Sequence, residues 1–169
     1  GDFSPRAVET LESCDFIAAE DTRVTVKLLN HFGIKKNMVS YFEHNRRERG
    51  EMIVARILAG ESCALVTDAG TPAISDPGED LVRLCAEKNI PVTAIPGCCA
   101  VVNALALSAL STQRFCFEGF LSTNKNERST RLNELKNDTR THIFYEAPHK
   151  LLFTLKDLYK IVGNRKICL

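Results

Sequence analysis

The chain has 169 residues, of which 44% are hydrophobic, so it can build one or two small globular domains. The chain has 22 Lys and Arg residues and 21 Asp and Glu residues, so it has no large net positive charge that would attract nucleic acid. Any binding to RNA or DNA must therefore come from a local basic patch. The longest apolar runs are far too short for a membrane span, and the first residues do not form a signal peptide.

The seven cysteines are odd in number and include no C-x-x-C pair. Most of them lie within apolar patterns: Cys63, Cys85, Cys116 and Cys168. This usage favours reduced core cysteines in a cytoplasmic protein over disulfides or zinc. We therefore expect no bound metal.

Strands and helices alternate through about residue 110. The first helix is predicted from Pro5 to about Cys14, with Ser4 as its cap. Apolar runs predict strands at 16–19, 39–42, 63–67 and 91–95, each followed by a helical pattern. This order predicts an α/β domain with a largely parallel sheet that helices cover on both faces. An α/β unit that starts with a helix usually lacks the strand before it, so the first strand is expected to be missing.

A second α/β pattern follows a linker at 111–114. It consists of a strand at 115–121 with a glycine break, a basic helical stretch at 125–136, a strand at 142–145, a helix through 151–161 and a strand at 166–169. We predict an N-terminal domain over 1–111 and a C-terminal domain over 112–169, the second appearing truncated.

Four successive strand ends carry acids, Gly or Pro: 20–23, 43–46, 68–78 and 96–100. In open α/β sheets these loops share one edge, where ligands bind. The loop at 66–78 is the most unusual, because two glycines and two prolines fix its backbone. The alternative is a tight turn in which Asp76 caps the next helix.

Several familiar sites are absent from the pattern. There is no Walker loop, dinucleotide fingerprint, hydrolase elbow or metal-ligand spacing. A rim of rigid loops with carboxylates suits a ligand with a positive centre, since one charge pair about 4 Å apart gives roughly 4 kcal/mol before desolvation at an effective dielectric near 20. The residues themselves predict a ligand-binding edge of an α/β sheet, and they do not identify the ligand.

The loop from Asp68 to Gly78 resembles the signature of the ribosomal RNA small subunit methyltransferase I family, in the tetrapyrrole methylase superfamily. Five other blocks match in the same order: Ser4-Pro5-Arg6-Ala7, Ala19-Glu20-Asp21-Thr22-Arg23, Pro96-Gly97, Gly119-Phe120-Leu121 and Tyr145-Glu146-Ala147-Pro148-His149. The match spans essentially the whole chain, and the long loop is its most specific part.

The resemblance implies methyl transfer from S-adenosylmethionine to a ribose 2′-hydroxyl of a cytidine in 16S rRNA, in the 30S subunit. It also implies two α/β domains of tetrapyrrole-methylase type, the second with a mixed sheet, the cofactor in a cleft between them, and a homodimer. Three alternatives remain: a methylase of a small tetrapyrrole, a non-catalytic nucleotide-binding module, and a small-molecule hydrolase. Two basic clusters favour RNA over the tetrapyrrole.

The family's cofactor contacts fall on three segments of this sequence. The resemblance implies contacts by Asp68, Ala69, Gly70, Thr71, Pro72, Ile74, Ser75, Pro96, Gly97, Cys98, Tyr145, Glu146, Ala147 and Pro148. For Glu146 the alternative is a helix-start acid favoured by the helix dipole.

The sulfonium already activates the methyl group, so the enzyme must place the 2′-oxygen and accept its proton. We expect Glu20 or Asp21 to accept the proton and Arg23 to hold a phosphate; the alternative is a capping cluster. His44 is a second candidate for the base, with an exposed polar residue as its alternative.

Two basic clusters are candidates for salt-dependent contacts with RNA. They are Arg46, Arg47 and Arg49 in one and Lys125, Arg128 and Arg131 in the other. Their alternative is a solvated helix face.

Three features depart from the family pattern. The family's first strand and its Pro-Ile-Gly-Asn loop are absent, and the family continues past Leu169. The chain also has Cys98-Cys99 where the family usually has Pro-Ser or a similar small pair, a change that a main-chain contact should tolerate.

Overall fold

The computed structural model describes residues 2–169 and divides the chain into two compact units, Gly1–Cys99 and Ala100–Leu169. We describe each unit by itself. The predicted boundary at residue 111 lies beyond α5 (Ala100–Leu107), which the structure groups with the second unit.

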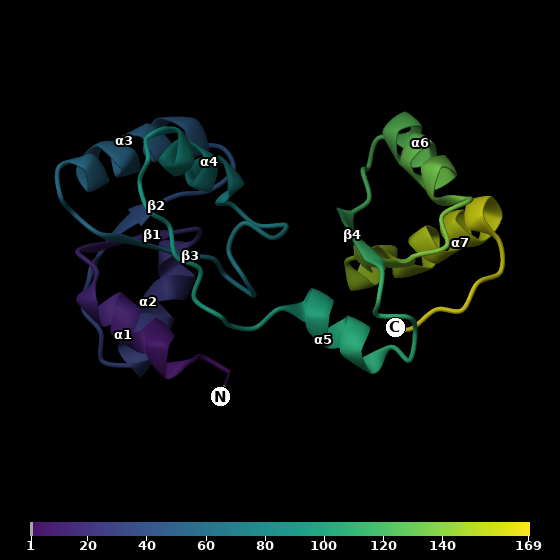
Figure 1. Cartoon of the computed structure of the whole chain (residues 1–169), viewed down its shortest axis with the longest axis horizontal. Helices are drawn as coiled ribbons and strands as arrows, with labels where there is room; N and C mark the ends of the chain where they lie inside the picture. Colours follow the sequence, from purple (N-terminus) through teal and green to yellow (C-terminus); the bar gives the residue numbers. More distant parts are fainter. Residues whose placement is uncertain (1) are drawn as a thin grey trace. The chain divides into compact units, whose positions relative to one another are not determined.

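Unit 1 alternates helices with short strands, as predicted (Figure 1). Its elements are α1 (Pro5–Ser13), β1 (Phe16–Ala19), α2 (Thr22–His31), β2 (Asn37–Ser40), α3 (Arg46–Leu58), β3 (Cys63–Val66) and α4 (Glu79–Glu87). The first helix begins as expected, since the Ser4 side chain accepts a hydrogen bond from the Ala7 N–H at 3.2 Å and Pro5 occupies the first turn.

The three strands form a parallel sheet in the order β2-β1-β3. The central strand is buried on both faces because its side chains alternate between two cores. Phe16 and Ala18 pack in a cluster with residues of α3 and α4, whereas Ile17 and Ala19 pack with residues of α1 and α2. Figure 1 shows these helix pairs on opposite faces of the sheet. The prediction of a parallel sheet covered on both faces is confirmed.

Two predicted strands do not form. Residues 91–95 and 166–169 have no strand structure, and all but Ile95 are exposed. Apolar sequence alone does not make a strand: a strand needs a hydrogen-bonded neighbour, and within the described residues neither segment has one. Pro91 also removes a donor from the first of them.

Unit 2 contains α5, β4 (Phe115–Phe120), α6 (Lys125–Leu135), β5 (Thr141–Tyr145), a 3₁₀ turn (Pro148–Lys150) and α7 (Leu151–Val162). The predicted glycine break in β4 is a shift of register between Phe117 and Gly119. Where we expected a mixed sheet, the two strands described are a parallel pair.

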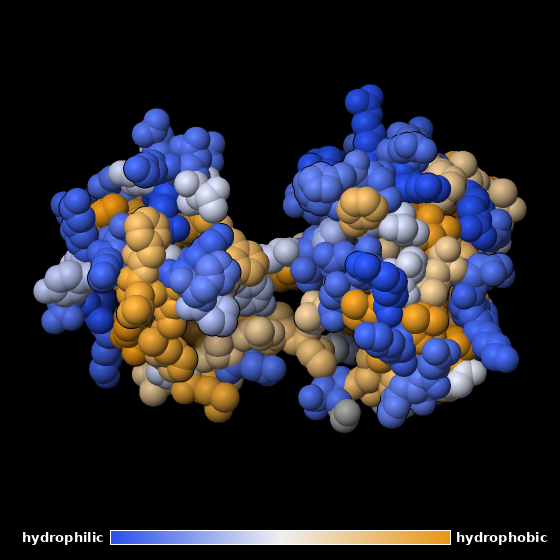
Figure 2. Space-filling view, turned by 180° about the vertical axis from the view of Figure 1, so that it is seen from behind, coloured by the Kyte–Doolittle hydropathy of each residue, from blue (hydrophilic) through white to orange (hydrophobic). Residues whose placement is uncertain are grey.

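An apolar hollow of about 830 Å³ lies in unit 2. Side chains from α5, β5, α7 and the segment after α7 line it. Figure 2 shows apolar side chains gathered on one face of this unit. Between residues 2 and 169, no helix has both the length and the apolar character that crossing a bilayer requires.

All seven cysteines are free, and their burial differs. Cys85 is buried and Cys63 partly buried, as the apolar patterns predict, and burial raises the pKa of the Cys63 thiol to about 12. Cys168, predicted to lie in a core strand, is exposed because that strand does not form.

Candidate functional site

The carboxyl ends of the three strands of unit 1 meet at one edge of the sheet. The Tyr41 N–H donates to the Ala19 carbonyl at 2.8 Å, and the Glu20 N–H donates to the Val66 carbonyl at 3.1 Å. The ladder therefore continues one residue beyond β1 and β2. The polar segments that follow these strands consequently begin side by side, as predicted for a ligand-binding rim.

The loop from Thr67 to Gly78 has a constrained backbone. Ala73 and Ser75 adopt positive φ angles of 68° and 60°, which L-residues rarely occupy, and Gly70 and Gly78 share this sign. A Cβ on Gly78 would lie 2.7 Å from Leu65 Cδ2, which can move, and 3.1 Å from the backbone nitrogen of Ala73, so the site has little space for a side chain and its φ of 143° also favours glycine. The loop holds a defined shape instead of serving as a plain connection.

Two of the predicted cofactor segments contact each other in unit 1. The Thr71 hydroxyl donates a hydrogen bond to the Cys98 carbonyl at 3.0 Å. A Cβ built on Gly70 would stand 3.9 Å from the same oxygen. The Cys98 thiol donates to the Asp2 carbonyl at 3.3 Å. The segment 96–98 therefore lies against the loop at 68–78, and Pro96, Gly97 and Cys98 are exposed beside it.

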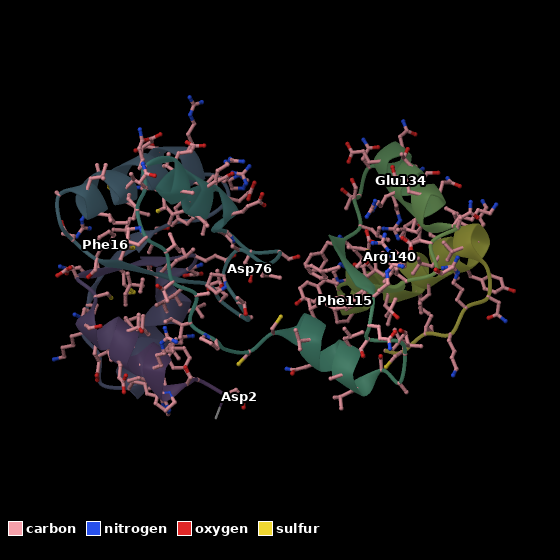
Figure 3. All side chains as sticks on the ribbon, viewed as in Figure 1. Asp2, Phe16, Asp76, Phe115, Glu134 and Arg140 are labelled. Atoms are coloured by element: carbon pink, nitrogen blue, oxygen red, sulfur yellow. The ribbon has the colours of Figure 1, made fainter. Side chains whose placement is uncertain are left out.

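Three carboxylates lie around this loop: those of Glu20, Asp68 and Asp76. The Asp68 N–H donates to Glu20 Oε2 at 3.2 Å, which ties the loop to the end of β1. Burial, followed by the charges of Glu20 and Asp68, raises the pKa of Asp76. Figure 3 labels Asp76 on the loop after β3. Because Gly78 is the N-cap of α4 and no side chain caps that helix, the alternative role of Asp76 as a cap is wrong.

Asp21 forms the capping cluster that we stated as the alternative to a role as proton acceptor. It is the N-cap of α2, accepts from the Arg23 N–H at 2.8 Å, and pairs with the exposed Arg23 guanidinium at 2.7 Å. The Arg23 side chain lowers the pKa of Asp21 to about 2. A carboxylate with that pKa is a poor proton acceptor near neutral pH, which leaves the predicted roles of Glu20 and Arg23 open.

The basic residues at the start of α3 are exposed or half-buried. Arg46 pairs with Glu43 at 3.2 Å and with Asp80 at 3.0 Å, so part of its charge is already neutralised. Arg47 is exposed, and Arg49 Nη1 lies 3.7 Å from Met52 Sδ. His44, the second candidate for a base, is exposed with its ring against Phe42.

The remaining predicted cofactor residues lie in unit 2, from Tyr145 to Pro148. The Tyr145 ring stands edge-on to the ring of Phe117, with centroids 4.9 Å apart. Glu146 accepts from its neighbour Ala147 N–H at 2.9 Å and from the Thr154 hydroxyl. Glu146 therefore binds the start of the helical segment after it, which is the alternative that we stated for it.

The predicted RNA cluster on α6 separates into three different environments. Arg128 is only 8% exposed, and its guanidinium donates to Asp157 Oδ2 and to the Thr154 hydroxyl, both at 2.7 Å. Arg131 pairs with the buried Glu118 and with Glu134. Lys125 is exposed at the first turn. The Arg128 guanidinium is thus used inside the unit, which conflicts with a phosphate contact on the surface.

The rim of unit 1 can hold a ligand that carries a positive centre. Its carboxylates favour such a charge, and its exposed backbone, which glycine leaves uncovered, allows a ligand to approach closely. The Thr67 hydroxyl is buried at the base of the loop and has no hydrogen-bond partner among the described residues. An unpaired buried polar group at the start of the loop that carries Asp68 and Asp76 fits a site that a polar ligand completes.

Sequence reasoning gave no role to Thr67 and considered Asp76 only as a possible helix cap. Asp76 belongs to the loop from Asp68 to Gly78, and a second acidic residue in a rigid loop was a sequence feature that could have pointed to a functional role. Thr67 lacked a signal, because a threonine at the end of an apolar run is also typical of an ordinary strand.

Comparison with known proteins identifies a family and its relatives. The family described as Tetrapyrrole (Corrin/Porphyrin) Methylases matches residues 1–167. A Synechocystis protein named Ribosomal RNA small subunit methyltransferase I is 54% identical over 166 residues, which cover 98% of this chain and 60% of the relative. A Haemophilus influenzae protein of the same name is 44% identical over 165 residues, covering 98% and 58%. The chain thus spans about three-fifths of the length of these curated relatives.

Solved structures give the fold. The methyltransferase CobJ superposes with a TM-score of 0.63 at 15% identity, over 93% of this chain and 69% of that one. Diphthine synthase superposes with a TM-score of 0.64 at 13% identity, over 94% and 67%. At these identities the likeness supports the fold class alone, which agrees with the α/β prediction.

Proposed function

The chain belongs to the tetrapyrrole (corrin/porphyrin) methylase family, and we propose that it forms the S-adenosylmethionine-binding part of an enzyme that methylates small-subunit ribosomal RNA. The observation that carries the proposal is the hydrogen bond from Thr71 to the Cys98 carbonyl, which joins two loops at the carboxyl edge of a parallel sheet. The names of the 44–54% identical relatives support the choice of ribosomal RNA as substrate.

The residues of the rim fit this cofactor. S-adenosylmethionine supplies a methyl group on a positively charged sulfur and also carries an amino acid group and a nucleoside. We propose that Asp68 to Ser75 contact its amino acid part and ribose, and that Pro96 to Cys98 line the other side. Tyr145 to Pro148 are proposed to contact the adenine.

The methyl acceptor that we propose is the ribose 2′-hydroxyl of a cytidine in 16S rRNA. Its proton needs an acceptor whose pKa lies near the working pH. The raised pKa of Asp76 favours this residue, with Glu20 beside it, over Asp21, whose pKa is about 2. The exposed Arg23 is proposed to hold a phosphate near the target sugar.

The RNA contacts are proposed for the exposed basic residues. These are Arg47 and Lys125, with the half-exposed Arg46, Arg49 and Arg131 in support. Arg128 is left out because its guanidinium is buried and bonded. The 30S subunit as partner and a homodimeric enzyme belong to the same proposal.

A second candidate is methylation of a small, flat tetrapyrrole. The apolar hollow of about 830 Å³ in unit 2 favours it, because such a substrate needs apolar walls. The relatives' names and the exposed basic residues favour RNA.

A methyl-transfer assay decides between the two substrates. In the Synechocystis relative, this chain replaces the matching 166 residues, and the chimera is incubated with tritiated S-adenosylmethionine and either 30S subunits lacking the modification or porphyrinoid precursors. We expect label in the RNA that alkali does not release as mononucleotides, as 2′-O-methylation requires. Label in the porphyrinoid alone would support the second candidate. Asp68→Ala in the chimera should reduce transfer, with Glu87→Ala on α4 as its control.

A further inference from the structure

Cys116 and His142 are direct neighbours on the parallel pair of unit 2. The register of β4 and β5 pairs Cys116 with His142, so their side chains leave the same face of the pair. Both residues are half-buried, and the Cys116 thiol is free. Neither residue has a role in the proposed methyl transfer.

The His142 ring is fixed in one orientation. Its side chain is 9% exposed, and Nδ1 lies 2.8 Å from Oε1 of Glu118, a carboxylate that is itself 1% exposed. Arg131 holds the other oxygen of Glu118 from α6, with 2.8 Å between Arg131 Nε and Oε2. With Nδ1 donating to Glu118, the lone pair of the neutral imidazole is on Nε2. That atom is buried and has no hydrogen-bond partner among residues 2–169.

The Nε2 atom faces the other members of a three-residue cluster. Asp138, in the turn before β5, places Oδ1 3.5 Å from Nε2, which is too long for a hydrogen bond. The thiol of Cys116, the carboxylate of Asp138 and the imidazole of His142 each offer one ligand atom, and all three atoms lie within 4.8 Å of one another.

We propose that Cys116, Asp138 and His142 form a binding site for a zinc-class divalent ion, with Glu118 as the carboxylate that orients His142. Thiolate and imidazole are ligands that zinc prefers, and three protein ligands leave one position for water. The carboxylate–histidine–metal arrangement is a recurrent feature of such sites. The thiol loses its proton on binding, so thiolate and carboxylate together balance the two charges of the ion.

The geometry requires a modest contraction. Zinc bonds of about 2.0–2.3 Å place tetrahedral ligand atoms roughly 3.3–3.8 Å apart, so atoms that lie within 4.8 Å of one another must close by at most about 1.5 Å. Asp138 forms an ion pair with Arg140, and Figure 3 labels Arg140. Arg140 is 41% exposed at its side chain, so it can turn toward water when the ion takes one oxygen of Asp138. The ion would join the turn at Asp138 to both strands and stabilise unit 2.

The alternative for His142 is an imidazolium that bridges Glu118 and Asp138 without a metal. It would donate from both ring nitrogens, but the 3.5 Å distance to Asp138 does not make the second hydrogen bond. The two states differ in a measurable way, because only metal binding requires the Cys116 thiolate.

Titration of the tag-free, metal-stripped chain with Co²⁺ and Zn²⁺ tests the proposal. We expect tetrahedral cobalt bands in the visible region, a thiolate-to-cobalt charge-transfer band in the near ultraviolet, and displacement of both by one equivalent of Zn²⁺. Zinc should also raise the melting temperature. Cys116→Ser should abolish the charge-transfer band, and Glu118→Gln should weaken binding by about 10- to 100-fold.

Matched variants separate this site from other thiols and imidazoles. Cys168→Ser, an exposed thiol of the same unit, and His31→Gln, an exposed imidazole, should leave both bands and the zinc affinity unchanged. Circular dichroism verifies that Cys116→Ser and His142→Gln remain folded. Absence of a thiolate band in the unmodified chain, or equal zinc affinity in Cys116→Ser and the unmodified chain, would overturn the proposal.

Discussion

The hydroxyl of Thr71 donates to the backbone carbonyl of Cys98 at 3.0 Å, across 27 residues of sequence. This bond fixes the loop after β3 against the segment before α5. Replacing Thr71 by Val keeps its shape and removes the donor, at a net loss of about 1 kcal/mol. If the two loops bind S-adenosylmethionine together, the Thr71→Val variant should bind it with a dissociation constant about fivefold higher, as measured by calorimetry. Thr71→Ser keeps the hydroxyl and should bind as the unmodified chain does; equal affinities in all three would separate this bond from cofactor binding.

The steric requirement at Gly78 predicts a loss of stability. Gly78→Ala introduces a Cβ that would lie 2.7 Å from Leu65 Cδ2 and 3.1 Å from the backbone nitrogen of Ala73, at a φ of 143°. The clash and the backbone strain together should lower the free energy of unfolding by about 2–4 kcal/mol, measured by urea denaturation. Gly60→Ala is the control, because Gly60 has a φ of 101° and no atom within 4 Å of the added Cβ. Gly60→Ala should lower the free energy of unfolding by about 1 kcal/mol, through backbone strain alone. Similar losses of stability in both variants would contradict the packing argument.

Asp76 and Asp21 should change stability with pH in opposite directions. Burial and neighbouring carboxylates raise the pKa of Asp76 in the folded chain. As pH rises from the ordinary Asp pKa of about 4 toward this raised value, the unfolded chain ionises first, so the free energy of unfolding falls. Asp76→Asn should remove that fall.

The contribution of Asp21 to the free energy of unfolding changes with pH in the opposite direction. Its pKa is lowered to about 2, chiefly by the Arg23 side chain, so its contribution is full above about 4 and is lost as pH falls toward 2. Asp21→Asn should remove this acid-dependent part. Denaturation midpoints over the range from pH 2 to 7, compared between the two variants, check both signs. A parallel shift of both curves would contradict the assignment.

Substitutions of Arg128 and Lys125, both on α6, should have different effects: the first should reduce stability and the second should reduce RNA binding. Arg128→Ala leaves the Asp157 carboxylate without its partner and removes one donor from the Thr154 hydroxyl, so it should lower the free energy of unfolding by about 2 kcal/mol or more. Lys125→Ala should leave stability within about 0.5 kcal/mol and reduce both RNA affinity and its salt dependence. Filter binding at several salt concentrations, with melting curves, measures both. An unchanged salt slope in Lys125→Ala would exclude this residue from the RNA contact.

The sequence predicted the layout of unit 1 because the pattern of its strands is local. Four apolar residues, Phe16 to Ala19, predict a strand buried on both faces, and the structure has it with those bounds. The glycine break in β4 was also visible in the sequence. The strand predicted at residues 91–95 was wrong, because an apolar pattern does not show whether a partner strand lies beside it.

The candidate site was predicted less completely, because side-chain partners depend on tertiary contacts. We read Arg128 as part of a basic surface, yet Arg128, Leu132 and Leu135 are spaced by four and three residues and share the buried face of α6. That spacing was available in the sequence. The pairing of Cys116 with His142 was not, since only the register of two strands separated by a helix brings them together.

Amide chemical shifts of the isotope-labelled chain, followed during titration with S-adenosylmethionine, test the central claim most directly. The account predicts saturable shifts concentrated at residues 68–75 and 96–98, reproduced by S-adenosylhomocysteine. The Thr71→Val variant should show the same residues shifting at higher ligand concentration. Saturable shifts that leave both loops unchanged, or the absence of any saturable shift there, would contradict the claim that this rim holds the cofactor.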